Sequence, residues 1–249
     1  MWDDKKKRLD IWLEENNFYT SRNIASNAIK LGLVSINGKI IFKNSARVSP
    51  FDKVLVDKNQ HIYVSRSAYK LHFIIHKLSS KISDLTCLDL GASTGGFTEV
   101  LLEYGASKVY CVDIGHDQLS SSLKQNPKVI NIEGTDVREV SLDIVKTCDI
   151  ITIDLSFISL KKAIQNIVIN SKSDTLFYIL FKPQFEVGRA EIHKNGIVKN
   201  EILVWDKLLE FKRWLIDQSM DEIKLFKSPI LGKDGNQEWL FFGRKYDKS

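Results

Sequence analysis

Four ionisable residues stand in sequence contexts that are unusual for simple surface charges: Lys70, Asp154, Lys182 and Glu238. Asp154 and Lys182 each directly follow an apolar run. Burying an unpartnered charge is costly, so a lysine after such a run is expected to have a partner or a ligand. Amines and carboxylates held close together can take up and pass on a proton, or stabilise a developing charge. Each residue alone would also fit an ordinary ion pair, but together the four indicate a reaction site.

A glycine-rich turn follows the apolar segment that ends at Leu90. Glycines let a ligand approach the backbone closely at the carboxyl edge of a parallel sheet. Asp113 ends the next strand, 22 positions after Gly91, where a carboxylate can accept hydrogen bonds from a ribose diol. Asp136 follows the third strand, where it could meet an adenine amino group. The pattern is not G-x-G-x-x-G, and it predicts a nucleoside-containing cofactor bound by Gly91, Ala92, Ser93, Gly95, Gly96, Phe97, Asp113 and Asp136.

These residues require a sheet to position them. Apolar runs alternate with helical patterns after about residue 64, which is typical of a parallel sheet flanked by helices. The sequence predicts seven strands in one open sheet, over Thr86–Leu90, Lys108–Asp113, Lys128–Glu133, Asp149–Asp154, Thr175–Lys182, Ile223–Ser228 and Glu238–Arg244. It predicts helices over Thr98–Tyr104, Gln118–Lys124, Leu160–Asn170 and Ile202–Asp217. Asp154 and Lys182 then lie at the ends of two neighbouring strands, on the ligand-binding edge.

The first quarter of the chain differs from the rest in charge. Residues 1–70 contain 13 basic and 7 acidic residues, whereas residues 71–249 contain 23 and 24. The net charge of +5 therefore lies entirely in the first part. Apolar residues between Arg8 and Leu31 recur at helical spacing, which predicts two short amphipathic helices. Asn37-Gly38 between two apolar segments predicts a type I′ hairpin, with further short strands at Val48 and at 54–56.

The order of residues in this segment resembles the alpha-L RNA-binding motif: Arg8-Leu9-Asp10, Ser21-Arg22-Asn23-Ile24-Ala25, Gly32-Leu33-Val34 and Ile36-Asn37-Gly38-Lys39. The resemblance implies that basic side chains contact structured RNA. Lysine and arginine neutralise phosphates, and structured RNA is recognised largely by shape and backbone. A solvated basic face is the alternative for any one of these side chains. The candidate RNA contacts are Arg8, Arg22, Lys39, Lys43, Arg47 and Arg66.

The whole chain resembles the TlyA family of rRNA 2′-O-methyltransferases, which carry haemolysin names. The matching segments are Leu88–Thr98, Val112–Gly115, Asp154–Leu160, Lys182–Gly188 and Gly235–Glu238. The family typically shows Ser-Arg-Gly-Gly where this chain has Ser65-Arg66-Ser67-Ala68. The resemblance implies an alpha-L RNA-binding α+β domain at 1–63 and an FtsJ-like α/β methyltransferase domain with a Rossmann-like sheet at 64–249.

The resemblance also implies S-adenosylmethionine as methyl donor and a ribose 2′-hydroxyl as acceptor, typically of a cytidine in ribosomal RNA. A 2′-hydroxyl is a poor nucleophile until its proton is removed. Lys182 is the candidate base, which requires desolvation or a cationic neighbour such as Lys70 to favour the neutral amine. Asp154 and Glu238 would orient the amines and the hydroxyl. Lys70 could instead stabilise a developing oxyanion, so which group is the base stays open.

Other classes of function have less support. The cysteines Cys87, Cys111 and Cys148 are odd in number and widely spaced, which argues against a disulfide framework and favours a reducing compartment. His72 and His76 share a helical face without a third ligand, so no metal is expected. With neither a signal peptide nor an apolar run long enough to span a membrane, a cytoplasmic protein is expected. The alternatives to the enzyme are a non-catalytic RNA-binding or ribosome assembly factor and a membrane-active haemolysin; the oligomeric state and the target nucleotide are left open.

Overall fold

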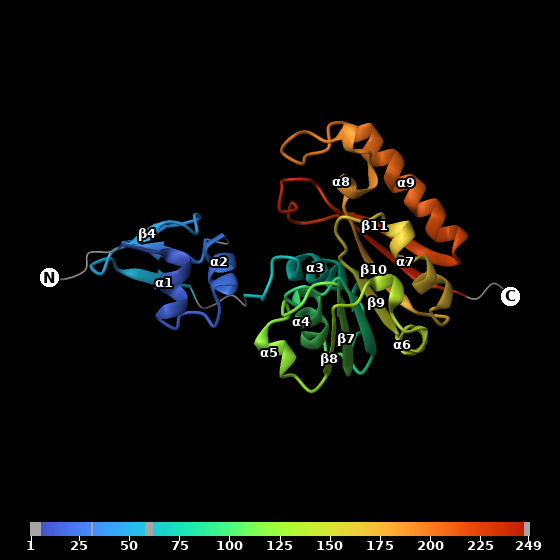
Figure 1. Ribbon diagram of the computed structural model, residues 1–249, viewed down its shortest axis with the longest axis horizontal. Coiled ribbons are helices and arrows are strands. Elements are labelled where there is room, and N and C mark those ends of the chain that lie inside the picture. Colours follow the sequence, from blue (N-terminus) through green and yellow to red (C-terminus); the bar gives the residue numbers. More distant parts are fainter. Residues whose placement is uncertain (1–5, 31, 58–61, 247–249) are drawn as a thin grey trace. The chain divides into compact units, whose positions relative to one another are not determined.

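A computed structural model describes residues 6–30, 32–57 and 62–246 of the 249-residue chain (Figure 1). The chain divides into two compact units, Met1–Arg66 and Ser67–Ser249. The residues predicted to connect the two, 58–61, lie outside the described part, as does Leu31. The domain boundary proposed after residue 63 stays a prediction.

The first unit is a small α+β fold of two helices and short strands. Its helices are α1 (Leu9–Glu15) and α2 (Arg22–Lys30), as the helical spacing predicted. Strands β2 (Val34–Ile36) and β3 (Lys39–Ile40) form a hairpin, and β5 (Val54–Val56) pairs with β2. The predicted Asn-Gly turn is present: φ is +52° at Asn37 and +80° at Gly38, the left-handed values that a type I′ turn needs. A two-stranded ribbon pairs β1 (Lys7–Arg8) with β4 (Arg47–Val48).

The core of this unit is small. Among the described residues it contains nine buried apolar side chains, which come from both helices, from three strands and from Leu33 just before β2: Leu9, Leu13, Ala25, Ala28, Ile29, Leu33, Val34, Val48 and Val54. Five of these side chains lie on the two helices, so helix packing supplies much of this core.

The second unit contains a seven-stranded sheet in the order β11-β12-β10-β9-β6-β7-β8. All strands are parallel except β12, which runs antiparallel to both β10 and β11. The strands are β6 (Thr86–Leu90), β7 (Lys108–Asp113), β8 (Val129–Glu133), β9 (Ile150–Ile153), β10 (Leu176–Phe181), β11 (Met220–Lys227) and β12 (Trp239–Lys245). The prediction of one open α/β sheet with these seven strands is confirmed.

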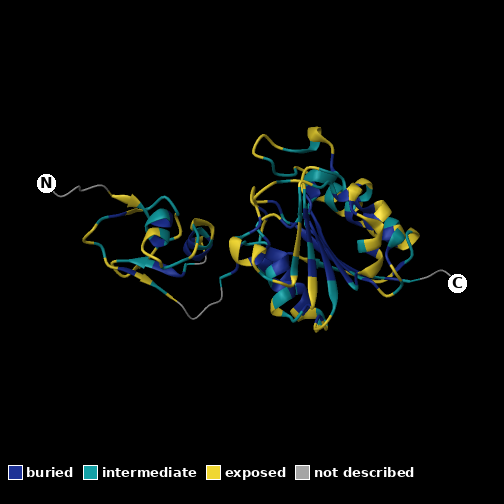
Figure 2. Cartoon of the chain, turned by 60° about the horizontal axis from the view of Figure 1, so that its bottom comes forward, coloured by how far each residue is buried: buried dark blue, intermediate teal, exposed yellow. Residues whose placement is uncertain are grey.

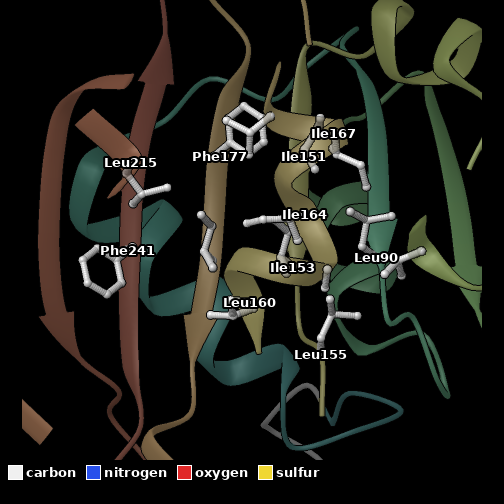
Figure 3. Close-up of a cluster of buried hydrophobic side chains, with 14 of the residues drawn as sticks. Leu90, Ile151, Ile153, Leu155, Leu160, Ile164, Ile167, Phe177, Leu215 and Phe241 are labelled. Atoms are coloured by element: carbon white, nitrogen blue, oxygen red, sulfur yellow. The ribbon is translucent and has the colours of Figure 1, made fainter. Parts of the chain in front are cut away.

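Helices cover both faces of this sheet. They are α3 (Ala68–Leu78), α4 (Gly96–Glu103), α5 (Ser121–Lys124), α6 (Leu142–Thr147), α7 (Leu160–Asn170), α8 (Pro183–Glu186) and α9 (Glu201–Asp217), with single 3₁₀ turns at Val137–Glu139 and Arg189–Glu191. Alternate strand residues such as Leu90, Ile153 and Phe177 form one apolar cluster with α7 and α9 (Figure 3). Figure 2 shows buried strands within the sheet, and exposed residues on helix faces, on loops and on parts of other strands. Strands β6, β9, β10 and β12 are buried along most of their length and have largely apolar sequences, whereas β8 and β11 include exposed residues.

Four helices differ from the prediction. Helices α3, α6 and α8 were not among the predicted ranges, and α5 begins at Ser121 rather than at Gln118. The backbone N–H groups of Gln118 and Leu119 donate to the Glu133 carboxylate instead of starting the helix. A contact between residues far apart in the sequence thus overrides the local helical pattern.

The two positions that depart from the family's glycine pair adopt ordinary backbone conformations. Ser67 has φ −60° and ψ −31° and directly precedes α3, and Ala68 is its first, fully buried residue. No left-handed conformation is needed at these positions, so serine and alanine cause no strain. The missing glycines therefore leave the helix that carries Lys70 intact.

Candidate active site

A cleft of about 600 Å³ opens at the carboxyl edge of the sheet, above β6, β7 and β9. We call it the strand-edge cleft; its lining residues are Gly91, Ser93, Asp113, Ile114, Gln118, Asp136, Val137, Asp154, Leu155, Ser156, Phe157 and Ile158. Ligands of open α/β sheets bind at this edge. The volume is within the range of small-molecule sites.

The glycine-rich turn enters the cleft through left-handed backbone. The φ angles are +81° at Gly91, +48° at Ser93 and +95° at Gly95. A Cβ added at Gly91 would lie 2.7 Å from the carbonyl oxygen of Asp154. Only glycine therefore lets this turn pass so close to the neighbouring strand end.

A buried carboxylate holds together the elements that flank the glycine-rich turn. Asp89 in β6 accepts hydrogen bonds from the hydroxyl groups of Thr98 in α4 and Thr152 in β9. Burial raises the pKa of Asp89 to about 6. The two bonds connect the strand before the turn to α4 after it and to β9 beside it, and Asp89 was not among the predicted site residues.

Asp113 joins two loops of the cleft. One oxygen of its carboxylate accepts from the backbone N–H of Ser93 at 2.8 Å and the other from Gly115 at 2.7 Å. A carboxylate can accept further hydrogen bonds beyond these two. Asp136 lines the same cleft and is paired with Arg138, whose hydrogen bonds lower the pKa of Asp136 to about 2. Both carboxylates can therefore accept bonds from a polar ligand.

Lys182 and Asp154 meet at the edge of the cleft. The amine Nζ of Lys182 lies 2.6 Å from Oδ1 of Asp154 and donates to Ser156 Oγ at 2.8 Å. The local sequence explains the placement, because the residue before a proline is driven to extended backbone. Lys182, which precedes Pro183, has φ −116° and ψ 101°, so the chain continues the direction of β10 for one residue and then turns.

Lys70 and Glu238 form a second, buried ion pair. Glu238 directly precedes Trp239, which pairs with Phe181 in the sheet, so Glu238 and Lys182 are the next residues outward on neighbouring strands. A Cβ at Gly232 would lie 2.5 Å from the Glu238 carboxylate. The four predicted residues are thus arranged as two lysine–carboxylate pairs at one edge of the sheet.

Glu186 connects the loop after β10 to the loop after β9. Its carboxylate accepts from the backbone N–H of Leu160 at 2.7 Å and from Ser159 Oγ at 3.0 Å. The rings of Phe185 and Phe157 add a contact, with centroids 4.9 Å apart. These contacts fix the segment that carries Asp154 relative to Lys182. Sequence reasoning missed Glu186 and Ser156, although both lie within the motif segments.

Four of the eight predicted cofactor residues line the cleft: Gly91, Ser93, Asp113 and Asp136. The other four, Ala92, Gly95, Gly96 and Phe97, are not among its lining residues. Gly95 precedes α4 and Phe97 is buried inside it, where both help to hold the helix beneath the turn. Ile114, Gln118, Val137 and Leu155–Ile158 line the cleft without having been predicted.

Two of the candidate RNA contacts are held by a carboxylate in the first unit. Asp10 is 2% exposed and accepts from both Arg8 and Arg22, at 2.8 to 3.0 Å. The two arginines together lower the pKa of Asp10 to about 2, against the opposing effect of burial. Asp10 thereby fixes the direction of both guanidinium groups.

The other candidate contacts are distributed along the first unit. Lys39, Lys43 and Arg47 are exposed on or beside β3 and β4, whereas Arg66 is partly buried at the end of the unit. Within the described residues, no group of histidine, cysteine and acidic side chains is placed to hold a metal ion. No helix in that part of the chain is long and apolar enough to cross a membrane.

Comparison with known proteins identifies the family. A family model described as FtsJ-like methyltransferase matches residues 63–245, and a model of the S4 domain matches residues 7–54. Hemolysin A of Brachyspira hyodysenteriae is 34% identical over 94% of this chain and 98% of its own length. The 16S/23S rRNA (cytidine-2′-O)-methyltransferase TlyA of Mycobacterium tuberculosis is 33% identical over 96% of this chain and 90% of its own length. The chain is a TlyA-family methyltransferase.

A solved structure agrees with this membership. A hemolysin-named protein from Streptococcus thermophilus is 31% identical to this TlyA-family protein, with a TM-score of 0.74, and the match covers 98% of this chain and 90% of that one. The predicted family, with an S4-type domain before an FtsJ-like domain, is confirmed.

Proposed function

We propose that this protein transfers a methyl group from S-adenosylmethionine to the 2′-hydroxyl of a cytidine in ribosomal RNA. The observation that carries the proposal is the pair of lysine–carboxylate contacts beside the strand-edge cleft, Lys182–Asp154 and Lys70–Glu238. The relative from Mycobacterium tuberculosis is named as an rRNA (cytidine-2′-O)-methyltransferase, which supports the same reaction. We expect the protein to act in the cytoplasm, on RNA within a ribosomal subunit.

The residues of the strand-edge cleft fit S-adenosylmethionine. The left-handed glycine turn leaves room for a ligand against the backbone at Gly91. In this proposal Asp113 accepts hydrogen bonds from the ribose hydroxyls and Asp136 from the adenine amino group, while Ile114 and Val137, which line the same cleft, contact the ring. The bound cofactor supplies an electrophilic methyl group.

The two ion pairs prepare the acceptor. In this proposal the amine of Lys182 takes the proton of the 2′-hydroxyl, while Asp154 and Ser156 hold that amine in position. Lys70, held by Glu238, stabilises the negative charge that develops on the oxygen. Glu186 keeps the two loops in register. Positioning the hydroxyl beside the methyl donor supplies a further part of the acceleration.

Cofactor binding tests the assignment of the cleft. We expect Asp113→Ala to weaken the affinity for S-adenosylmethionine about 10- to 100-fold in isothermal titration, because a charged acceptor contributes about 1.5–3 kcal/mol. Asp143→Ala is the matched control, since Asp143 is an exposed aspartate of α6 outside the cleft. Equal affinities for both variants and the original protein would remove Asp113 from the cofactor site.

The first unit is proposed to bind RNA through Lys39, Lys43 and Arg47 together with Arg8, Arg22 and Arg66. Replacing Lys39, Lys43 and Arg47 by alanine is expected to weaken rRNA binding. It should also reduce the slope of log affinity against log salt by about 2, since each phosphate contact contributes roughly 0.7–0.9. The control removes three exposed lysines at the opposite, amino edge of the sheet: Lys81, Lys108 and Lys146. An equal change of slope in both triple variants would show a non-specific charge effect and contradict the RNA-binding role.

A further inference from the structure

A second cleft opens at the same edge of the sheet, above β10, β12 and β11. Its volume is about 360 Å³, and it is bounded by the beginning of α9 and by the loop before β12. Pro183 and Gln237 line it, and they are the chain neighbours of Lys182 and Glu238. The strand order places the proposed reaction centre between this cleft and the strand-edge cleft. A strand of RNA that presents a 2′-hydroxyl to Lys182 therefore has room to continue over this second cleft.

Two tryptophans form one wall of the second cleft. Trp205 in α9 and Trp239 at the start of β12 have ring centroids 4.8 Å apart at an interplanar angle of 63°. Trp239 is buried, but Trp205 is 47% exposed. A half-exposed indole beside a cavity offers a surface on which a flat ring can stack. Nucleobases bind to such surfaces whatever their sequence, because every base has a π-face.

The charges around the second cleft also fit a nucleotide. The amine of Lys227, at the end of β11, lies 5.6 Å from the ring centroid of Trp239 and lines the cleft. Lys233, in the loop before β12, is exposed. The carboxylate of Glu201, at the start of α9, belongs to the same lining. Lysines can neutralise a phosphate, and a carboxylate can accept a hydrogen bond from the amino group of a base.

We propose that the second cleft binds a nucleobase next to the target nucleoside, stacked on Trp205, with Lys227 at the adjoining phosphate. The inference rests on the proposed function, because it takes RNA as the substrate. It adds a contact to single-stranded RNA in the second unit, apart from the basic side chains of the first. Such a contact would hold the target strand unstacked while its hydroxyl is at Lys182.

The test measures affinity for purified rRNA by filter binding, and methyl transfer to the same RNA in parallel. Trp205→Ala should weaken rRNA affinity about tenfold, the loss expected for one stacked base, while affinity for S-adenosylmethionine stays unchanged. Trp205→Phe should recover most of the affinity because it restores a stacking ring. Ile216→Ala is the matched control, since Ile216 lies on the same helix, outside the cleft, and is also 47% exposed.

A Trp205→Ala protein that binds rRNA like the original, or that changes no more than Ile216→Ala, would overturn the proposal. If Trp205→Ala does not fold, Lys227→Gln decides: a salt slope lowered by roughly 0.7–0.9 supports the cleft, and an unchanged slope refutes it. The two readouts, rRNA affinity and methyl transfer, distinguish this proposal from the proposed function. If the original protein binds rRNA but does not methylate it, the proposed function is contradicted, and Trp205→Ala still tests the second cleft. If the original protein does not bind rRNA, both proposals are contradicted.

Discussion

Lys182→Ala is expected to lower the rate of methyl transfer at least about 100-fold, while the affinity for S-adenosylmethionine stays within about twofold. The amine of Lys182 contacts Asp154 and Ser156 but does not itself line the strand-edge cleft. Removing the amine is therefore expected to slow proton removal from the 2′-hydroxyl without weakening cofactor binding. Asp154→Ala should reduce the rate to a similar degree, because the amine loses the carboxylate that positions it.

Lys182→Arg separates two roles for this residue. An arginine keeps the positive charge but does not act as a base at neutral pH. If the amine takes the proton, Lys182→Arg should be nearly as slow as Lys182→Ala. An active Lys182→Arg would instead assign Lys182 to charge stabilisation.

The matched control for Lys182 is another lysine–aspartate pair, which lies just before the same two strands rather than just after them. Lys172 and Asp149 lie 2.6 Å apart, the same distance as Lys182 and Asp154, but near the beginnings of β10 and β9 rather than their ends. Lys172→Ala should keep the original rate. Unchanged turnover in both Lys182→Ala and Asp154→Ala would remove the proposed reaction centre and favour a non-catalytic RNA-binding protein.

Gly91→Ala is expected to reduce the affinity for S-adenosylmethionine at least about tenfold. The change has two costs: φ is +81°, which strains any side chain by about 1–3 kcal/mol, and the new Cβ would lie 2.7 Å from the Asp154 carbonyl oxygen. Backbone cannot give way as a flexible side chain can, so the turn and the end of β9 must separate. That movement also displaces the Asp154 carboxylate, so the rate should fall with the affinity.

Gly38→Ala is the control for the strain at Gly91. Gly38 has nearly the same φ, +80°, but no atom lies within 4 Å of an added Cβ. The Gly38→Ala protein should have a lower free energy of unfolding but the original affinity for S-adenosylmethionine. If Gly91→Ala retained the original affinity, close approach to the backbone at this turn would not be needed, and the cofactor would have to bind elsewhere.

The edge at which the site forms was predictable from sequence. Apolar runs ending at Leu90, Ile153 and Phe181 can be recognised locally, and parallel strands end at a common edge. Asp154 and Lys182 therefore had to lie near each other. The glycine turn and Asp113 followed from the same reasoning.

The pairing of side chains was not predictable in this way. Lys70 and Glu238 are 168 positions apart, and the helix that carries Lys70 was not predicted. The side chain of Ser67 makes no capping hydrogen bond, and the helix sequence is rich in aromatic and β-branched residues with modest helix propensity. Tertiary packing of Leu71, Ile74 and Ile75 stabilises this helix.

The sequence also did not reveal which basic side chains are paired with carboxylates, or which aromatic side chains are exposed. Arg8 and Arg22 were counted as basic charges, but both are bound to the buried Asp10. The exposure of Trp205 likewise depends on where α9 packs against the sheet, which its helical pattern does not reveal.

Nucleoside analysis of the RNA product tests the central claim most directly. Purified small and large ribosomal subunits are incubated with the protein and with S-adenosylmethionine labelled in its methyl group, and the rRNA is then digested to nucleosides and examined by mass spectrometry. The label is predicted to appear in 2′-O-methylcytidine, and to be absent when Lys182→Ala replaces the original protein. Label in a base-methylated nucleoside, or no label in RNA from either subunit, would contradict the account.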